Sequence, residues 1–493
     1  MQTFTPYEPE IPGMYRFEED IVEVMDEAIP LCTTREIKEC IQKLKLRKAP
    51  GFDSITAEVL VQIPHNILTD LTNLINSCIK LSYVPAIWKV AEVIMIPKPG
   101  KPPNDVSSYR PISLLPILSK LMEKLFLKRL MPIIIAKNLI PTHQFGFREG
   151  HSTIDQIHRI TNMIENAFEA KQVCSAVFLD VSQAFDKVWH EGLIHKLKSQ
   201  LPKSFCNFLT SYLCGRFFRV KLEGEYSSLK PIGAGVPQGS ILGPILYLLF
   251  TNDVPTSSNF FTATFADDTV LLTTGKTAQE STDSLQAALD TITTWTKRWR
   301  IKLNNLKSVH VDFTNMEIPH HQLYIDNVEI PYSNTAKYLG MTLDCKLRWN
   351  EHVKKKKKEL QLKLSNLYWL LGRTSKVSVY NKLLVYQQVL KPVWTYGIQL
   401  WGCTSKSNIQ IIQTFQNKAI RLIMNCPWYV RNPDLQRDIG VESVERVISQ
   451  FATSHSLRLR HHVNAEAAML TTSDATTRRL RRKRPQDLVT SLI

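Results

Sequence analysis

Three aspartates of this chain stand where apolar, strand-forming segments end. Residues 175–180 read SAVFLD, so Asp180 closes an apolar strand. Asp267 and Asp268 occupy the turn within a second apolar segment, 262–273, whose spacing is that of a β-hairpin. Carboxylates beside buried strands lose hydration, and adjacent aspartates repel each other, unless a cation compensates. These acids therefore constrain the chain to a fold in which strand ends meet a source of positive charge.

Two Mg²⁺ ions would supply that charge. A pair of ions about 3.5–4 Å apart is the usual arrangement for phosphoryl transfer. Three carboxylates leave room for substrate phosphates among the ligands of each ion. The alternative is structural, because aspartate is common in turns and an aspartate at a strand end often caps a helix. The acids alone leave both interpretations open.

The charge balance of the chain is strongly basic. Lysine and arginine number 61 against 45 acidic residues, a formal charge of +16. This balance favours a polyanionic partner, most simply nucleic acid, although a solvated basic surface would give the same count. The lysine run at 354–358 could be a phosphate track or a solvated helix face. The segment 478–484 could be a nuclear-import signal, a nucleic-acid patch or a basic tail.

Cysteine usage and apolar runs bound the environment of the chain. The nine cysteines form no C-x-x-C pair. This argues against a zinc module or a secreted disulfide framework, and it fits a reducing compartment. The longest apolar stretch, Ile241–Phe250, is too short to span a bilayer, and the first residues lack the pattern of a signal peptide. We expect an intracellular, soluble protein without a membrane partner.

Hydrophobic periodicity predicts a mixed α+β centre with helical flanks. Thr33 and Glu36 form a capping pair that opens a helix. Further helices are predicted over 56–82, a strand over 90–96, a long helical region over 113–138 and mostly helix beyond 343.

The chain also carries eight short segments in a fixed order. They are KAPGFDSI (48–55), IPKPGKPPNDVSSYRPISLLPILSKLMEKL (96–125), HQFGFREGHSTIDQI (143–157), AVFLDVSQAFDKVWH (176–190), GVPQGSILGPILYLLFTNDV (235–254), FADDTVLL (265–272), LNNLKS (303–308) and YLGMTLD (338–344). Together they resemble the reverse transcriptases of LINE-type, non-LTR retrotransposons, and most closely the jockey-like group. Another reverse transcriptase lineage, such as an intron-encoded maturase, shares the YRPI and FADD segments. The resemblance covers roughly residues 44–350 and continues more weakly to the C-terminus.

The resemblance implies a right-hand polymerase fold of the α+β class, with fingers, an antiparallel palm sheet and a helical thumb. The domains it implies are an N-terminal tether (1–32), an N-terminal helical extension (33–77), fingers and palm (78–345), and a helical thumb with a basic C-terminal region (346–493).

The resemblance also implies a catalytic role for the acids. Asp180 matches the metal-binding acid of the first palm motif, where Val181 would lend its backbone carbonyl. Asp267 and Asp268 match the paired acids of the F/Y-x-D-D hairpin. The cofactor implied is two Mg²⁺ ions, with Mn²⁺ as a substitute. Lys307 lies where the family carries a candidate proton donor to pyrophosphate.

Four further residues are implied to bind the nucleotide. Lys98 and Arg110 would be the cations over the triphosphate, with Lys101 competing for the role of Lys98. Phe185 falls where an aromatic side chain would clash with a ribose 2′-hydroxyl, although a core aromatic is the structural alternative. Gln238 belongs to a loop that packs on the templating base and the nucleotide.

The remaining motif residues are assigned as follows. Contacts with template and primer are implied for Gly239, Tyr338, Leu339 and Gly340. Asp186 is expected to cap or to form a salt bridge within the palm. No metal role is expected for His143, His151 or His190, because none has a partner at ligand spacing.

The function implied is that of an RNA-directed DNA polymerase that adds dNTPs to a primer 3′-hydroxyl. Its partners would be an RNA template, a DNA primer or target DNA, and dNTPs, and it would act in the nucleus on chromosomal DNA. We expect endonuclease activity to come from a further domain or in trans. The alternative is a catalytically idle RNA-binding scaffold or an inactive remnant, which would not need the three acids to be intact.

Overall fold

The computed structural model describes residues 4–8, 26–98, 100–105, 108–471 and 478–489. The chain forms two compact units, between which it passes several times. The first unit comprises 1–141, 181–255 and 291–304, and the second comprises 142–180, 256–290 and 305–493. This division differs from the linear domains of the sequence prediction, which stay a prediction.

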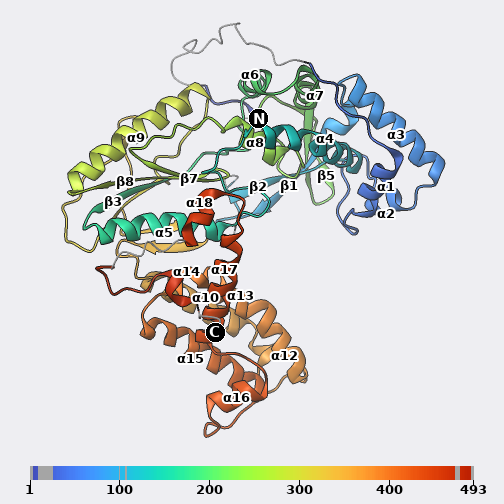
Figure 1. Ribbon diagram of the computed structural model, residues 1–493. Coiled ribbons are helices and arrows are strands. Elements are labelled where there is room, and N and C mark those ends of the chain that lie inside the picture. Colours follow the sequence, from blue (N-terminus) through green and yellow to red (C-terminus); the bar gives the residue numbers. More distant parts are fainter. Residues whose placement is uncertain (1–3, 9–25, 99, 106–107, 472–477, 490–493) are drawn as a thin grey trace. The chain divides into compact units, whose positions relative to one another are not determined.

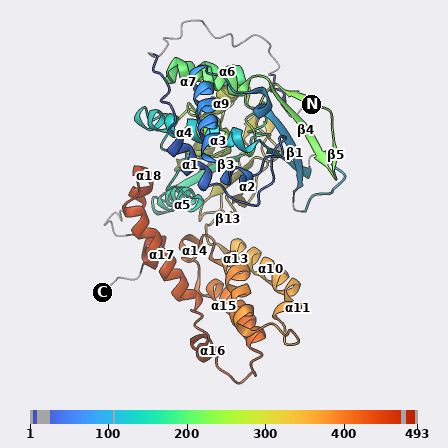
Figure 2. The same ribbon diagram turned by 90° about the vertical axis from the view of Figure 1, so that its right-hand side faces the viewer.

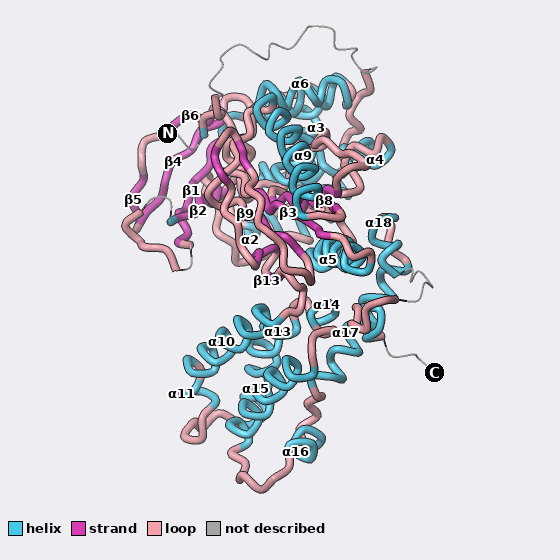
Figure 3. Tube along the Cα trace, turned by 90° about the vertical axis from the view of Figure 1, so that its left-hand side faces the viewer, coloured by secondary structure: helices cyan, strands magenta, loops and turns pink. Residues whose placement is uncertain are grey.

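A four-stranded antiparallel sheet forms the centre of the second unit. Its order is β7 (Phe261–Phe265), β8 (Asp268–Gly275), β3 (Val173–Leu179) and β9 (Val309–Phe313). Helix α5 (Thr153–Glu169) covers one face, and the first part of α9 (Ala278–Arg298) covers the other (Figures 1 and 3). Every residue of β3 is buried, which explains why this strand reads as a continuous apolar run without alternation.

The rest of the second unit is largely helical, as predicted (Figure 2). A short hairpin, β12 (Thr335–Tyr338) and β13 (Met341–Asp344), precedes the helices. The helices are α10 (Asn350–Asn366), α11 (Tyr368–Leu371), α12 (Val379–Val385), α13 (Lys391–Thr395), α14 (Ile398–Trp401), α15 (Lys406–Met424), α16 (Asn432–Asp438), α17 (Val444–Arg460) and α18 (Ala465–Ala468). Trp349, Trp394 and Trp401 are fully buried among them.

The basic segment 478–484 is held against the second unit. The Arg479 backbone N–H donates to Glu169 at the end of α5, and the Arg484 guanidinium lies 3.6 Å from the Glu165 carboxylate. Arg478 forms a bidentate salt bridge with Asp487. Arg479 and Arg484 therefore dock the C-terminal segment on α5, whereas the Arg478–Asp487 pair lies within that segment.

The first unit contains a second sheet, in the order β2 (Tyr109–Leu114), β1 (Val90–Pro97), β4 (Arg216–Leu222) and β5 (Glu225–Tyr226), with β6 (Lys230–Ile232) also paired to β4 (Figure 3). Its helices are α1 (Thr34–Gln42), α2 (Ala57–Val61), α3 (His65–Lys80), α4 (Ile117–Ala136), α6 (His190–Gln200), α7 (Lys203–Leu213) and α8 (Gly243–Phe250). The Glu36 N–H donates to Thr33 Oγ1 at 3.2 Å, as the predicted cap requires. The helix predicted from Ser113 starts only at Ile117, because β2 extends to Leu114 in its pairing with β1.

The α+β class is confirmed. Of the segment predicted to be a tether, the residues around Ile29 and Cys32 pack into the core of the first unit, and the Phe4 ring contacts the Phe218 ring edge to face. Much of that segment lies outside the described residues. Among the helices that the structure describes, none has the length and apolar character needed to cross a bilayer.

Candidate active site

The hairpin between β7 and β8 presents Asp267 and Asp268. Phe265 pairs with Asp268, so the turn consists only of Ala266 and Asp267. Ala266 has a φ of +57°, in the left-handed region. A non-glycine residue there costs about 1–2 kcal/mol, so the surrounding structure has to hold the turn in place.

Gln144 is the residue that holds it. Its Oε1 accepts hydrogen bonds from the backbone N–H groups of Ala266 and Gly146, both at 2.8 Å, and its Nε2 donates to the Ala266 carbonyl at 3.3 Å. Gly146 also lies against the turn, because a Cβ atom there would be 2.2 Å from the Ala266 nitrogen. The sequence prediction quoted this segment but gave neither residue a role. An amide side chain two positions before a glycine was the only signal.

Asp180 follows β3 directly and lies beside the hairpin. The β3–β8 register pairs Leu179 with Thr269, which brings the end of β3 to the start of β8. The Asp180 N–H donates to Ser308 Oγ at 3.2 Å, and Lys307 Nζ is 3.9 Å from Asp180 Oδ2. The structure therefore brings together Asp180, the aspartate pair and Lys307.

The pKa of Asp268 records this crowding. Partial desolvation of its carboxylate, followed by the charges of Asp267 and Asp180, raises that pKa to about 6. The carboxylate is thus desolvated although the residue as a whole is exposed, and the two neighbouring charges act in the same direction. Three carboxylates gathered at one end of a sheet are a set of oxygen donors suited to hard divalent cations. The donor set therefore fits the metal ions that the sequence predicts.

In the first unit, Phe185 and Gln238 belong to one locally connected group. The Val236 N–H donates to the Phe185 carbonyl at 2.8 Å, and the Phe185 ring stacks on Tyr247 with centroids 4.6 Å apart. Gln238 Nε2 donates to Asp186 Oδ1 at 3.2 Å. Burial raises the pKa of Asp186 to about 7, against the opposing effect of that hydrogen bond. Asp186 thus orients Gln238, a contact that the sequence prediction did not give it.

Gly239 stands at the end of the same loop. Its φ is +116°, and a Cβ atom there would lie 2.6 Å from the Ser113 carbonyl oxygen. The Ser113 N–H donates to the Gln238 carbonyl at 2.9 Å. Glycine is required here because the loop backbone contacts the β2 backbone directly.

Arg110 and Lys98 lie near the turn between β1 and β2. Arg110 is exposed and pairs with Ile96 across the two strands, while the Lys98 N–H donates to the Ser108 carbonyl at 2.7 Å. Val181 forms an isolated antiparallel bridge with Leu303, also in the first unit. The nucleotide and metal roles of these residues stay predictions.

The turn of the β12–β13 hairpin is tightly constrained. Leu339 and Gly340 have φ values of +42° and +80°, and the Tyr396 hydroxyl donates to the Leu339 carbonyl at 2.6 Å. Tyr338 is only 4% exposed, with its ring 5.6 Å from that of Phe178. Its side chain supports the hairpin, so any contact with a template or primer would involve the backbone of the turn.

Comparison with known proteins gives a consistent result. The family model described as "Reverse transcriptase (RNA-dependent DNA polymerase)" matches residues 96–343. The chain is 41% identical over 460 residues to the "Probable RNA-directed DNA polymerase from transposon X-element" of Drosophila melanogaster, which covers 92% of this chain and 51% of that protein. It is 38% identical over 506 residues to the "RNA-directed DNA polymerase from mobile element jockey" of the same organism, with 99% and 55% covered.

Among solved structures, a telomerase from Candida Tropicalis in complex with a fragment of telomeric RNA is similar at a TM-score of 0.38 and 13% identity, with 83% of this chain and 69% of that chain covered. A score this low adds nothing to the fold description. The chain spans about half the length of the curated relatives it matches.

Proposed function

Because this chain belongs to the reverse transcriptase (RNA-dependent DNA polymerase) family, we propose that it is the polymerase of a jockey-like non-LTR retrotransposon and copies an RNA template into DNA. The observation that carries the proposal is the gathering of Asp180, Asp267 and Asp268 where β3 meets the β7–β8 hairpin. A scaffold that only bound RNA would have no use for three mutually repelling carboxylates at one place.

The three aspartates would hold two Mg²⁺ ions, with Mn²⁺ as a substitute. When bound, such ions would favour deprotonation of the primer 3′-hydroxyl and neutralise charge on the leaving pyrophosphate. The hydrogen bonds between Gln144 and Ala266 fix the backbone that carries Asp267, so the carboxylate positions are set before substrate arrives. Lys307, whose side chain is 65% exposed beside Asp180, would donate a proton to pyrophosphate.

Residues of the first unit would select the nucleotide. Arg110 and Lys98 would bind the triphosphate through their positive charge, and the exposed guanidinium of Arg110 can also form bidentate hydrogen bonds with phosphate. The Phe185 ring is fixed by its stack on Tyr247 and would exclude a ribose 2′-hydroxyl by steric contact. Gln238, oriented by Asp186, would contact the base pair without adding charge.

The partners that this function requires are an RNA template, a DNA primer or target DNA, and dNTPs. The formal charge of +16 favours such polyanions. Copying into chromosomal DNA would take place in the nucleus and would require an endonuclease, from a further domain or in trans.

The test is primer extension by the full chain on an RNA template, after removal of divalent cations and then with Mg²⁺ or Mn²⁺ restored. We expect extension with dNTPs only when a divalent cation is present. RNA binding without extension under all of these conditions would overturn the proposal and favour the idle scaffold.

A further inference from the structure

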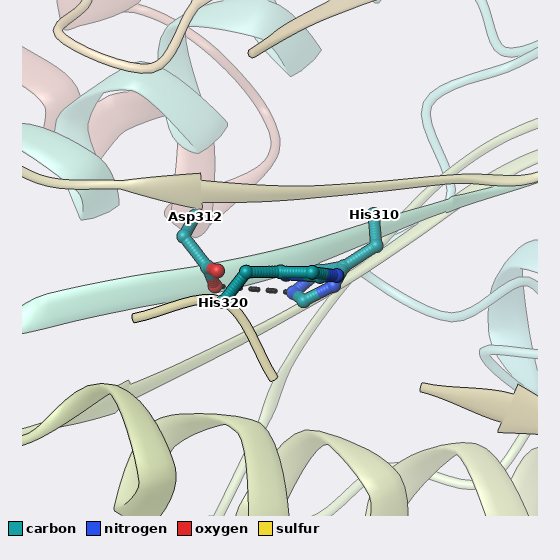
Figure 4. Close-up of side chains that lie close together, drawn as sticks. All are labelled: His310, Asp312 and His320. Atoms are coloured by element: carbon teal, nitrogen blue, oxygen red, sulfur yellow. Dashed lines mark hydrogen bonds and ion pairs between the residues drawn. The ribbon is translucent and has the colours of Figure 1, made fainter. Parts of the chain in front are cut away.

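A second cluster of ligand-forming side chains lies on the sheet of the second unit, and the polymerase function does not use it. Strand β9 carries His310 and Asp312, which are two residues apart and so project from the same face. His320, from the segment that follows β9, joins them, and the ligand-forming atoms of all three lie within 4.8 Å of one another (Figure 4). The β3–β9 register places this pair opposite Val177 and Ser175, in the middle of both strands.

The interior of this cluster is polar and buried. The side chains of His310 and Asp312 are 0% and 1% exposed. His310 Nε2 lies 3.1 Å from Asp312 Oδ1, and Ser175 Oγ donates to the same oxygen at 2.6 Å. Within the described part of the chain, His310 Nδ1 and Asp312 Oδ2 have no hydrogen-bond partner. Buried polar atoms without partners are costly, so the arrangement needs an explanation.

A simple ion pair between His310 and Asp312 accounts for only part of this arrangement. It would explain the 3.1 Å contact, but it gives no reason for a second imidazole to approach. The His320 ring packs on Tyr332 at 3.8 Å between centroids, and Tyr332 also contacts the His310 ring edge-on at 5.4 Å. One tyrosine thus fixes both rings, as a preformed ligand site requires.

The donor types indicate the class of ligand. Two imidazoles and one carboxylate suit Zn²⁺ and similar transition metals, whereas Mg²⁺ prefers oxygen ligands alone. Ser175 supplies the hydrogen bond that ligating carboxylates usually receive.

We propose that His310, Asp312 and His320 form a binding site for a divalent transition-metal ion of the zinc class, with water completing its coordination. The ion would tie the irregular segment 314–323 to β9. That segment is the first part of the connection from β9 to the β12–β13 hairpin. The last part of the connection is already fixed to β9, because the Ser333 N–H donates to the His310 carbonyl at 2.9 Å. The site is exposed only through His320, which gives the ion a route of entry from solvent.

The test uses the full chain, from which bound metal is first removed with a chelator. The chain is then titrated with Co²⁺ in the presence of excess Mg²⁺, which occupies the sites that offer only oxygen ligands. Visible absorption reports nitrogen-ligated, low-coordinate Co²⁺, and displacement by Zn²⁺ gives the relative affinity. The variant is His320→Ala, since the side chain is exposed and its loss leaves the core intact. The matched control is His321→Ala, which removes the neighbouring imidazole.

We expect the wild-type chain and His321→Ala to bind one equivalent of Co²⁺, and Zn²⁺ to raise the Tm of both. His320→Ala should weaken binding at least about 100-fold, more than the 10–100-fold loss typical of an outer-shell change. Absence of the absorption band in the wild-type chain, or equal binding by His320→Ala, would overturn the site. An Asp267→Asn chain should still bind Co²⁺, so this test is independent of whether the polymerase proposal holds.

Discussion

The aspartate group and the histidine–aspartate cluster stand on the same antiparallel sheet and differ in almost every physical respect. Asp180, Asp267 and Asp268 lie at strand ends, reach solvent and repel one another, with Lys307 nearby. The other group lies in the middle of β9, and His310 and Asp312 are fully buried and bonded to each other. Both groups are suited to bind cations, but the forces acting within them are opposite.

This difference indicates the kind of cation each group can serve. Accessible carboxylates with excess negative charge can exchange ions that arrive with a charged substrate. A buried mixed nitrogen and oxygen set closes around an ion and links the segments that supply the ligands. The first arrangement suits turnover and the second suits structure, and the two should therefore respond in opposite ways to mutation.

The largest expected effect is that two variants, one in each group, each lose a different property of the protein. Asp267→Asn should lower primer extension on the order of 10³-fold, since several kcal/mol of transition-state charge stabilisation is lost. It should leave the Zn²⁺-dependent rise in Tm unchanged. His320→Ala should abolish that rise and leave extension within about threefold of wild type, because surface changes away from a site have small effects.

Primer extension and thermal unfolding with and without Zn²⁺ measure both effects. Asp283→Asn, at an exposed carboxylate on α9, is the control for Asp267→Asn and should behave as wild type. If Asp267→Asn kept wild-type extension, the catalytic interpretation of the aspartate group would be wrong.

The second prediction concerns the backbone beneath the aspartate pair. Gly146→Ala would place a Cβ atom 2.2 Å from the Ala266 nitrogen and 2.9 Å from the Phe265 carbonyl carbon, so the hairpin must shift. A displacement near 1 Å at a reacting centre costs about 10²-fold in rate. Extension should fall by that amount, while binding of Co²⁺ at the histidine cluster is retained.

Gly150→Ala is its matched control. Gly150 has a φ of +76°, but a Cβ atom there would meet nothing within 4 Å. The alanine should cost about 1–2 kcal/mol of stability through backbone strain and leave extension nearly unchanged. Equal loss of extension in both variants would show that global stability, and not the position of the hairpin, governs the rate.

Much of the aspartate group could be predicted from the sequence, for physical reasons. Asp180, Asp267 and Asp268 are fixed by strand and turn patterns that span only a few residues each. Gln144 could not be predicted, because it acts on Ala266 across 122 residues through a side-chain hydrogen bond that leaves no periodic signal. His320 reaches its partners through an irregular segment, whose path depends on tertiary packing, and the sequence analysis singled out none of the three residues of this cluster.

The exposure of a motif side chain is likewise hard to predict from the sequence. The sequence predicts a contact with nucleic acid for Tyr338, yet the packing of the β12–β13 hairpin against the sheet buries its ring. A motif identifies a residue as part of a site, but the burial of its side chain depends on neighbours far away in the chain.

The third prediction concerns stability at the hairpin. Gln144→Met keeps the size of the side chain and removes its three hydrogen bonds to the Ala266 and Gly146 backbone. Leaving two buried N–H groups without partners should lower the free energy of unfolding by about 1–3 kcal/mol. Denaturant unfolding measures this loss. The control is Gln410→Met, at an exposed position, which should change the free energy of unfolding by no more than about 0.5 kcal/mol. Equal losses in the two variants would contradict a stabilising role for the Gln144 hydrogen bonds.

The smallest expected effect is the pH dependence of stability, and here the two groups have opposite signs. Desolvation and the charges of Asp267 and Asp180 raise the pKa of Asp268 to about 6 in the folded protein, above its ordinary value near 4. Burial alone would raise the pKa of Asp312, but the hydrogen bond and charge of His310 lower it below its ordinary value. A raised carboxyl pKa means that the folded state binds more protons, so Asp268 adds stability as the pH falls from about 6 toward 4.

Without divalent cations, the free energy of unfolding of the wild-type chain should therefore rise relative to that of Asp268→Asn over this window. Asp312 contributes stability above its unfolded pKa and loses it only in stronger acid, as the pH falls through its lowered folded pKa. Denaturant titrations of both chains between pH 4 and 7 measure the difference. A constant difference across the window would show that the aspartates do not crowd one another in solution. Addition of Mg²⁺ should reduce the rise in stability between pH 6 and 4, since a cation at the aspartates competes with the proton on Asp268.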